Sequence, residues 1–313
     1  MSRLEKLMKA DRPWIADAGL ETVMIFFEGL DLPHFASFFL LDSQEGRAAL
    51  TRYFDKFLPV ARDGGSGLVL DTATWRANMG WAAAMGLDAA AIRDANLRAV
   101  AFARDYRTMN ETTGLPILVN GVLGPLGDGY VVGTAVTAAA AEKLYAAQIA
   151  VLAEAGVDLI SAVTMTYPAL AIGAARAAAR DGLPHVISFT LETDGCLPNG
   201  QTLQAAIAEV DAATGGSPLF YMVNCAHPTH FQHLLTGEWV KRIGGIRANA
   251  SRMSHAELDV MTELDDGDPD EFGALYRDLG AVLPNLRLIG GCCGSDHRHV
   301  GAASHHFHSH RAA

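Results

Sequence analysis

The cysteines are the residues of this chain whose type and spacing point most directly to chemistry. Two of them, Cys292 and Cys293, are adjacent within the run Gly-Gly-Cys-Cys-Gly at 290–294, where glycines let the backbone curl tightly. A third, Cys225, follows Asn224 at the end of another apolar run. Zinc favours tetrahedral sulfur and nitrogen ligands, and catalytic zinc sites leave one position open. We therefore predict that Cys225, Cys292 and Cys293 bind Zn²⁺ and leave a position for a substrate thiol.

Other interpretations of the cysteines are weaker. A single buried cysteine such as Cys225 would by itself indicate core packing. A disulfide between the adjacent Cys292 and Cys293 would strain the peptide between them. In a large chain that is predicted to be cytoplasmic, scattered cysteines are read as metal ligands or reactive thiols before disulfides. The fourth cysteine, Cys196, lacks a comparable setting, and we interpret it as an ordinary loop or core thiol.

Eight short apolar runs could position these residues. They are rich in Val, Ile, Leu or Phe without strict alternation, which is typical of strands buried on both faces of a parallel sheet. Alanine-rich segments between them, such as 135–155, 170–180 and 202–213, predict helices. The predicted strands are Trp14–Ala18, Gly67–Asp71, Pro116–Asn120, Asp158–Val163, His185–Phe189, Leu219–Asn224, Gly245–Asn249 and Leu286–Gly290.

This alternation predicts an α/β fold, a single (β/α)8 TIM barrel over residues 1–313. It would have a short N-terminal segment and a loose, His-rich C-terminal tail from about residue 303. The alternative is a doubly wound sheet, but no G-x-G-x-x-G opens its first helix. In a closed barrel the last strand lies beside the first, two strands from the sixth. Cys225 can therefore meet Cys292 and Cys293 above the barrel mouth, where barrel enzymes carry their active sites.

The net charge and the lengths of the apolar runs limit the classes of partner that the protein is expected to bind. The net charge of −11 argues against nucleic acid and anionic membrane surfaces as partners. No run reaches the roughly 20 apolar residues of a membrane helix, and the N-terminal residues do not read as a secretory signal. We expect a cytoplasmic protein that binds small molecules, and a homo-oligomer is compatible with the sequence.

At its cysteine motifs the chain resembles the homocysteine S-methyltransferase family, which includes betaine–homocysteine and S-methylmethionine–homocysteine enzymes. The family's signatures are an Asn-Cys pair after strand 6, here Asn224-Cys225, and Gly-Gly-Cys-Cys-Gly after strand 8, here 290–294. Weaker matches are the turn that opens at Asp17, the Thr-Trp-Arg-Ala-Asn stretch at 74–78 and the glycine-rich loop at 121–127.

The resemblance implies a (β/α)8 barrel with zinc on three cysteines, which moves a methyl group from a sulfonium or quaternary ammonium donor to a thiol such as homocysteine. It also implies a role in methionine biosynthesis. Trp75 is the main candidate for a cation–π contact with the donor, with Trp81 and Tyr167 as further candidates. The candidate substrate-binding residues are Asp17, Glu21, Trp75, Asn224 and Thr164.

The departures from the family concern the acceptor. The family's fourth strand usually ends in Glu-Thr, and that carboxylate helps to hold the amino group of homocysteine. The corresponding pair here is Val163-Thr164. An acidic residue of the first turn is replaced by Val23, with Glu21 two positions earlier. A buried ammonium group without a counter-charge is costly. Either Glu21 compensates, or the acceptor is not homocysteine.

Two other functions are compatible with a zinc barrel. One is a hydrolase or lyase with water at the open position, although such enzymes more often use His and carboxylate ligands and these strand ends are poor in His. The other is a non-catalytic barrel that the metal only braces. Both remain open on the sequence alone.

Overall fold

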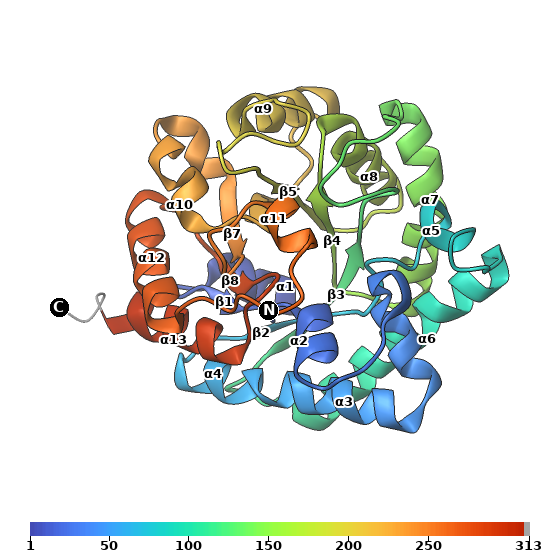
Figure 1. The fold of residues 1–313 in the computed structure, drawn as a ribbon, viewed down its shortest axis with the longest axis horizontal. Coiled ribbons are helices and arrows are strands. Elements are labelled where there is room, and N and C mark those ends of the chain that lie inside the picture. Colours follow the sequence, from blue (N-terminus) through green and yellow to red (C-terminus); the bar gives the residue numbers. More distant parts are fainter. Residues whose placement is uncertain (310–313) are drawn as a thin grey trace.

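The computed structural model describes residues 1–309, and eight parallel strands in it close into one barrel (Figure 1). Each strand pairs with its sequence neighbours, and β1 pairs with β8 to complete the ring. The strands are β1 Trp14–Ile15, β2 Leu68–Asp71, β3 Ile117–Leu123, β4 Leu159–Met165, β5 His185–Thr190, β6 Tyr221–Asn224, β7 Ile243–Ala248 and β8 Leu288–Gly291. The predicted (β/α)8 barrel and its eight strand positions are confirmed.

Helices surround the barrel and connect successive strands (Figure 1). The α-helices are α1 Arg3–Lys9, α2 Leu20–Phe26, α3 Gln44–Asp55, α4 Phe57–Asp63, α5 Met79–Ala82, α6 Ala89–Asn110, α7 Ala138–Ala155, α8 Pro168–Arg180, α9 Leu203–Thr214, α10 Pro228–Phe231, α11 His255–Asp259, α12 Pro269–Val282 and α13 His297–Ser309. Short 3-10 helices span Pro33–Phe35, Ser37–Asp42, Gln232–Leu234 and Glu238–Arg242. Among the helices described, none is long and apolar enough to cross a membrane.

Local sequence signals set the helix ends. Thr137 caps α7 by accepting a hydrogen bond from the backbone of Ala140, and α7 stops at Gly156, whose φ of 84° is left-handed. Thr202 and Gly215 do the same for α9. Side-chain caps satisfy backbone N–H groups that lack a partner in the first turn, and glycine takes the left-handed conformation at little cost.

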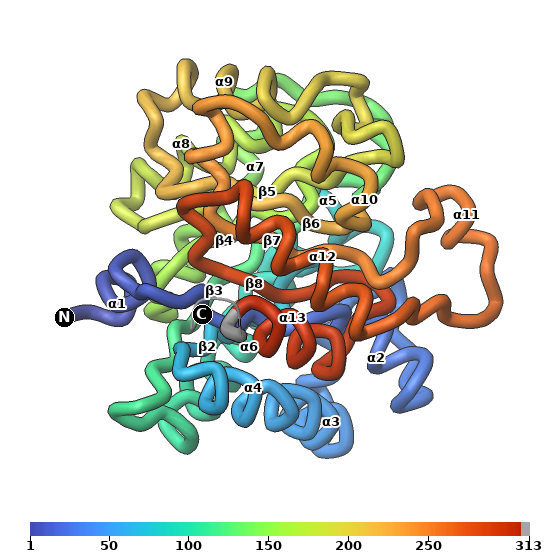
Figure 2. The backbone as a smooth tube through the Cα atoms, turned by 90° about the vertical axis from the view of Figure 1, so that its left-hand side faces the viewer, coloured from blue at the N-terminus to red at the C-terminus, as the bar shows by residue number. Residues whose placement is uncertain are grey.

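The interior of the barrel is apolar. Val69, Leu118, Leu159 and Val186 belong to one buried cluster that the inward-facing strand residues form. Leu7 of α1 is fully buried in the same cluster, so α1 plugs the amino end of the barrel. Figure 2 shows α1 and α11 at opposite ends of the molecule. A second, larger cluster packs the helices onto the outside of the sheet.

Strand β4 is irregular near its carboxyl end. Its pairing with β5 shifts register between Ala162 and Met165. Thr164 lies inside this irregularity with a φ of 61°, in the left-handed region that β-branched residues rarely adopt. The sequence predicted a strand that ends at Val163 with Thr164 just after it. The bulge instead turns Thr164 within the strand, toward the end of β6.

The structure contradicts the prediction of a loose C-terminal tail from about residue 303. Residues 303–307 are not loose, because α13 runs through them and buries Ala303 and Phe307. The ring of Phe307 lies against Gly280 of α12, where a methyl group would clash with it. A glycine on α12 therefore admits an aromatic side chain from α13. Residues 310–313 of the predicted tail lie outside the described residues.

We predict that Phe307→Ala lowers the free energy of unfolding by about 3 kcal/mol, because it removes a buried aromatic side chain and leaves a cavity. His305→Ala, at an exposed position of the same helix, should change it by less than about 0.5 kcal/mol. Urea unfolding followed by circular dichroism would measure both. Equal values for the two variants would show that α13 contributes no packing here.

Candidate active site

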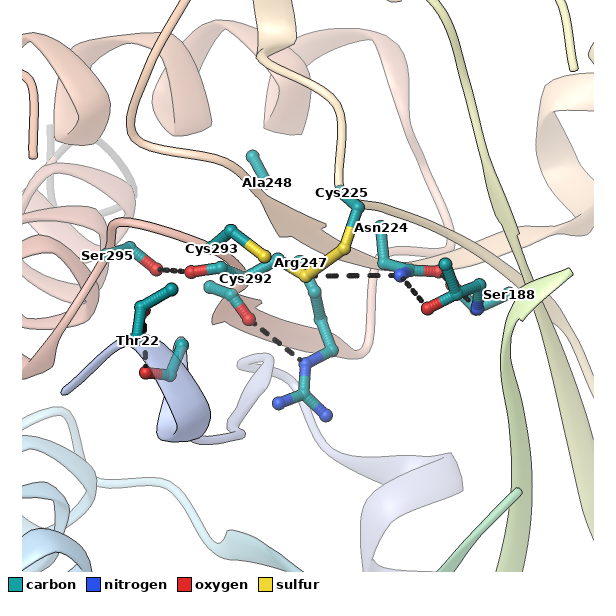
Figure 3. The surroundings of a disulfide bond; sticks show 12 residues. Thr22, Ser188, Asn224, Cys225, Arg247, Ala248, Cys292, Cys293 and Ser295 are labelled. Carbon is teal, nitrogen blue, oxygen red and sulfur yellow. Dashed lines mark hydrogen bonds between the residues drawn. A yellow bond between two sulfur atoms is a disulfide. The ribbon is translucent and has the colours of Figure 1, made fainter. Parts of the chain in front are cut away.

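The three cysteines of the predicted metal site lie together at the carboxyl ends of β6 and β8 (Figure 3). Cys225 follows β6, and Cys292 and Cys293 follow β8. Their Sγ atoms all lie within 4.8 Å of one another. Cys225 is buried, whereas Cys292 and Cys293 are half-buried. The barrel thus brings together sulfurs that are far apart in the sequence.

The backbone is constrained at these residues. Cys225 has a φ of 52°, and its amide donates to the carbonyl of Arg247 on β7. A non-glycine residue in this region costs energy and is held by its surroundings. In the other segment, Ser295 Oγ donates to the carbonyl of Cys292 at 2.6 Å. Any side chain at Gly291 would strike that hydroxyl, which explains one glycine of the motif.

Cys225 and Cys292 form a disulfide in the structure, and Cys293 is a free thiol. The sequence argued for thiols rather than a disulfide, and here the structure differs. The Cα atoms of Cys225 and Cys292 are 5.4 Å apart, a normal separation for a disulfide. The same convergence that suits three metal ligands therefore also permits oxidation of two of them.

Asn224 organises the tops of three strands (Figure 3). Its Oδ1 accepts hydrogen bonds from the Thr164 amide at 3.0 Å and from Ser188 Oγ at 2.6 Å. Its Nδ2 donates to Thr164 Oγ1 at 2.9 Å and lies 4.0 Å from Cys292 Sγ. The side chains of Asn224 and Thr164, both predicted to bind substrate, thus bond to each other. They hold the β4 bulge beside the sulfurs.

Arg247 on β7 is a buried cation that the sequence analysis missed. Its guanidinium forms ion pairs with Asp17, after β1, and with Asp71 at the end of β2. Its Nε donates to the carbonyl of Gly291. Asp71 also accepts from Asn120 Nδ2 at 2.7 Å. One arginine therefore joins four strand ends around the barrel mouth.

This pairing changes the expected role of Asp17. The sequence predicted Asp17 as a substrate-binding residue, but its carboxylate is buried against Arg247. Burial raises the pKa of Asp17, Arg247 opposes that rise, and the negative charge of Asp71 adds to it. The side chain is thus already engaged with a cation of the same chain.

A second buried arginine, Arg76, lies between two tryptophans. Its Cζ is 3.9 Å from the ring centroid of Trp75 and 3.8 Å from that of Trp81. The sequence proposed Trp75 and Trp81 as faces for a cationic donor, and one face of each already carries Arg76. Burial lowers the pKa of Arg76 to about 10, which leaves it charged at neutral pH. The third aromatic candidate, Tyr167, is buried and accepts from the Val136 amide at 3.0 Å.

Tyr130, from the loop after β3, lies over the sulfurs. Its hydroxyl is 3.4 Å from Cys293 Sγ and 3.7 Å from Cys225 Sγ. Its ring stacks on His255, with centroids 4.0 Å apart. His255 Nε2 donates to the Cys225 carbonyl at 2.5 Å, and its Nδ1 faces Glu192 at 3.3 Å. Burial raises the pKa of Tyr130, so the hydroxyl keeps its proton and can donate to sulfur.

The two positions that depart from the family, Val163 and Val23, are both buried, and Glu21 lies two positions before Val23 in α2. Val163 is buried among the apolar residues of the barrel interior. Glu21, in the first turn of α2, accepts a hydrogen bond from Ser37 at 2.9 Å. Burial raises the pKa of Glu21, while Arg76 and Arg247 act to lower it. Cys196 is not part of the cysteine cluster; it lies in the loop after β5, where its backbone pairs with that of Thr202.

Some of the site residues that were not predicted could have been recognised from their positions in the sequence. Arg247 stands inside a predicted strand whose neighbours are apolar, and Asp71 and Asn120 end two other strands. A lone arginine in a buried strand needs a carboxylate partner, and acidic residues at strand ends are the nearest source. Tyr130 lies in the long loop between β3 and α7, and His255 begins the short helix α11 after β7. The sequence gives no register in these segments that would place either residue over the sulfurs.

A closed parallel barrel with three cysteines at the carboxyl ends of its strands defines a TIM-barrel enzyme with a sulfur-lined site. A family model for homocysteine S-methyltransferase matches residues 14–307. The chain belongs to the homocysteine S-methyltransferase family, as the sequence motifs predicted. It is therefore a methyltransferase that acts on a thiol. A search of curated protein sequences found no match.

Solved structures agree on the fold. The homocysteine methyltransferase MmuM from Escherichia coli in its oxidized form is 20% identical, with a TM-score of 0.76, over 97% of this chain and 99% of that one. The metallated form of the same protein has a TM-score of 0.74 at 20% identity, over the same shares of the two chains. At this identity the likeness supports the fold alone.

We predict that Arg247→Met lowers the free energy of unfolding by about 3–5 kcal/mol at pH 8, because it leaves Asp17 and Asp71 buried without a cation. Burial raises the pKa of Asp17 and Arg247 opposes that rise, so without Arg247 the folded-state pKa of Asp17 would lie further above its unfolded value of about 4. Stability is lost as the pH rises from the unfolded pKa through the folded one, so the loss should be smaller at pH 5 than at pH 8.

Arg252→Met is the matched control. Arg252 pairs with Glu271, and both side chains are exposed, so the change should cost less than about 1 kcal/mol at either pH. Denaturant unfolding at the two pH values measures all three proteins. An equal loss for Arg247→Met at both pH values would contradict the ion-pair interpretation.

Proposed function

We propose that this protein is a zinc-dependent S-methyltransferase that moves a methyl group from a sulfonium or quaternary ammonium donor to a small-molecule thiol. The observation that carries the proposal is the convergence of Cys225, Cys292 and Cys293 within 4.8 Å at the barrel mouth. Homocysteine is the acceptor that the family name suggests. A cytoplasmic location, and a role in methionine biosynthesis where homocysteine is the acceptor, belong to the same proposal.

The donor set fits zinc. A tetrahedral zinc ion with Zn–S bonds of about 2.3 Å needs sulfurs about 3.8 Å apart, so the Sγ atoms of Cys225 and Cys292 must separate from their disulfide, while all three sulfurs already lie within 4.8 Å. Burial raises the pKa of the Cys293 thiol, with Tyr130 opposing, and a nearby divalent cation would lower it. Cys225 and Cys292 can act as ligands only once their disulfide is reduced by two electrons and two protons.

Bound zinc would lower the pKa of the acceptor thiol and so supply a thiolate nucleophile. The acceptor sulfur forms a bond to the methyl carbon as the bond from that carbon to the donor's sulfur or nitrogen breaks. The electron pair leaves with a neutral thioether or tertiary amine, so no acid or base is required at the leaving group.

The surrounding residues supply position and exclude water. Tyr130 covers the sulfurs and keeps a protonated hydroxyl that can donate to them. His255 anchors the backbone of Cys225, and Asn224 holds the β4 bulge at the same level. These contacts keep the site in one arrangement, which is what an in-line displacement requires.

The test uses protein reduced with a phosphine, which is not itself a thiol acceptor. We expect one zinc per chain, methyl transfer to a thiol, and loss of both in Cys292→Ser. Cys196→Ser should retain both, because Cys196 is not one of the three clustered cysteines. Elemental analysis gives the zinc content. A panel of thiols and methyl donors, followed by mass spectrometry, gives the transfer.

The outcomes separate the alternatives. Zinc binding with no mass gain on any thiol would favour a structural metal. Water added to a substrate, or a product of elimination, would indicate a hydrolase or lyase. Full transfer in Cys292→Ser or after chelation would refute the proposal.

A further inference from the structure

Among the described residues of the barrel mouth, Arg76 is a buried cation that forms no ion pair with a carboxylate. Arg76 is 6% exposed, and its Nη1 donates to the carbonyl of Gly127 at 3.1 Å. Its Nε has no hydrogen-bond partner. Within the described part of the chain, no carboxylate lies at ion-pair distance from Arg76, whereas Arg247 has two. A buried guanidinium stays charged and is costly without an anion.

Arg76 lies beside the sulfur site. It belongs to the loop after β2, and it contacts Gly127 in the β3–α7 loop that also carries Tyr130. Its charge acts on Tyr130, whose hydroxyl lies 3.4 Å from Cys293 Sγ. Trp75 and Trp81 hold the guanidinium plane from two sides. Such stacking fixes the fork of donors in one orientation, which suits a planar carboxylate.

At the same barrel mouth, the side chains that could bind a substrate ammonium group are either engaged with other residues or replaced by an apolar one. Asp17 is paired with Arg247, and Val163 presents an apolar side chain. Glu21 acts on Cys293, but its carboxylate already accepts a hydrogen bond from Ser37, and the carboxylate of Glu192 faces His255. The side chains at the barrel mouth are therefore better suited to bind a negatively charged substrate group than a positively charged one.

We propose that Arg76 binds the carboxylate of the thiol acceptor, and that the acceptor is a mercaptocarboxylate whose recognition needs no α-ammonium group. This inference rests on the proposed methyl transfer and names its acceptor class. Sulfonium and betaine-type donors can also carry a carboxylate, so the experiment must separate the two sources.

Binding is measured first, by calorimetry without a methyl donor, on reduced and zinc-loaded protein. The probes are homocysteine, its analogue without the amino group, and its analogue without the carboxylate. We expect the desamino analogue to bind at least as tightly as homocysteine and the decarboxy analogue to bind least. Arg76→Gln should weaken the desamino analogue about ten- to hundredfold, the range of a charge-assisted hydrogen bond.

Two variants control for structure. Arg76→Lys keeps the charge and should recover part of the affinity. Arg93→Gln removes an exposed arginine of α6 and should change nothing. If Arg76→Gln fails to fold, as judged by its thermal midpoint, the comparison between Arg76→Lys and the unaltered protein, which differ in the planar fork, takes its place. Butanoate titrated into the metal-free protein tests the carboxylate site separately from any methyl transfer.

Several results would overturn the inference. Equal affinity of Arg76→Gln and the unaltered protein for the desamino analogue would remove Arg76 from the site. Homocysteine binding tenfold tighter than the desamino analogue, with the advantage lost in Glu21→Gln, would show that the ammonium is recognised. A raised KM for the donor with an unchanged KM for the acceptor in Arg76→Gln would assign the carboxylate to the donor. Carboxylate binding without any methyl transfer would leave Arg76 supported and the proposed function refuted.

Discussion

The side-by-side pairing of β6, β7, β8 and β1 in the closed barrel is the constraint on which the site depends. The seam between β1 and β8 is short, because only Trp14 and Ile15 of β1 pair with Leu288 and Ile289 of β8. Beside it, Arg247 reaches from β7 past the end of β8 to Asp17 and Asp71. Backbone pairing and a buried ion-pair cluster thus hold the same junction. The cysteines after β8 keep their position relative to Cys225 because both segments bond to β7, Cys225 to the carbonyl of Arg247 and Cys292 to that of Ala248.

Two arginines at the mouth have opposite surroundings. Arg247 is surrounded by carboxylates and acts as part of the framework, whereas Arg76 is held by aromatic rings. Desolvating a cation is costly in both cases, and the structure offsets that cost differently. Carboxylates offset it with opposite charge, and tryptophan faces offset it with a weaker attraction that leaves the donors partly available. Arg247 is therefore a structural cation, whereas Arg76 keeps donors that can bind a ligand.

The sequence predicted the strands and the sulfur cluster well, for physical reasons that are visible in particular residues. Runs such as Leu68–Asp71 are apolar on both faces, and this alone indicates a buried parallel strand. Glycines around Cys292 and Cys293 marked a backbone with a special shape. The bulge at Thr164 was not predictable, because it depends on hydrogen bonds to Asn224, which is 60 residues away. The packing of Phe307 on Gly280 was hidden for the same reason, since composition suggested only a polar tail.

The plug formed by α1 has a consequence for how substrates reach the site. Leu7 fills the amino end of the barrel, so that end offers no path to the sulfurs. Both substrates and both products must therefore enter and leave at the carboxyl end of the barrel. The molecule that sits deepest, against the cysteines, enters first and departs last. A single shared route implies ordered binding, in which the thiol binds first and the methyl donor second.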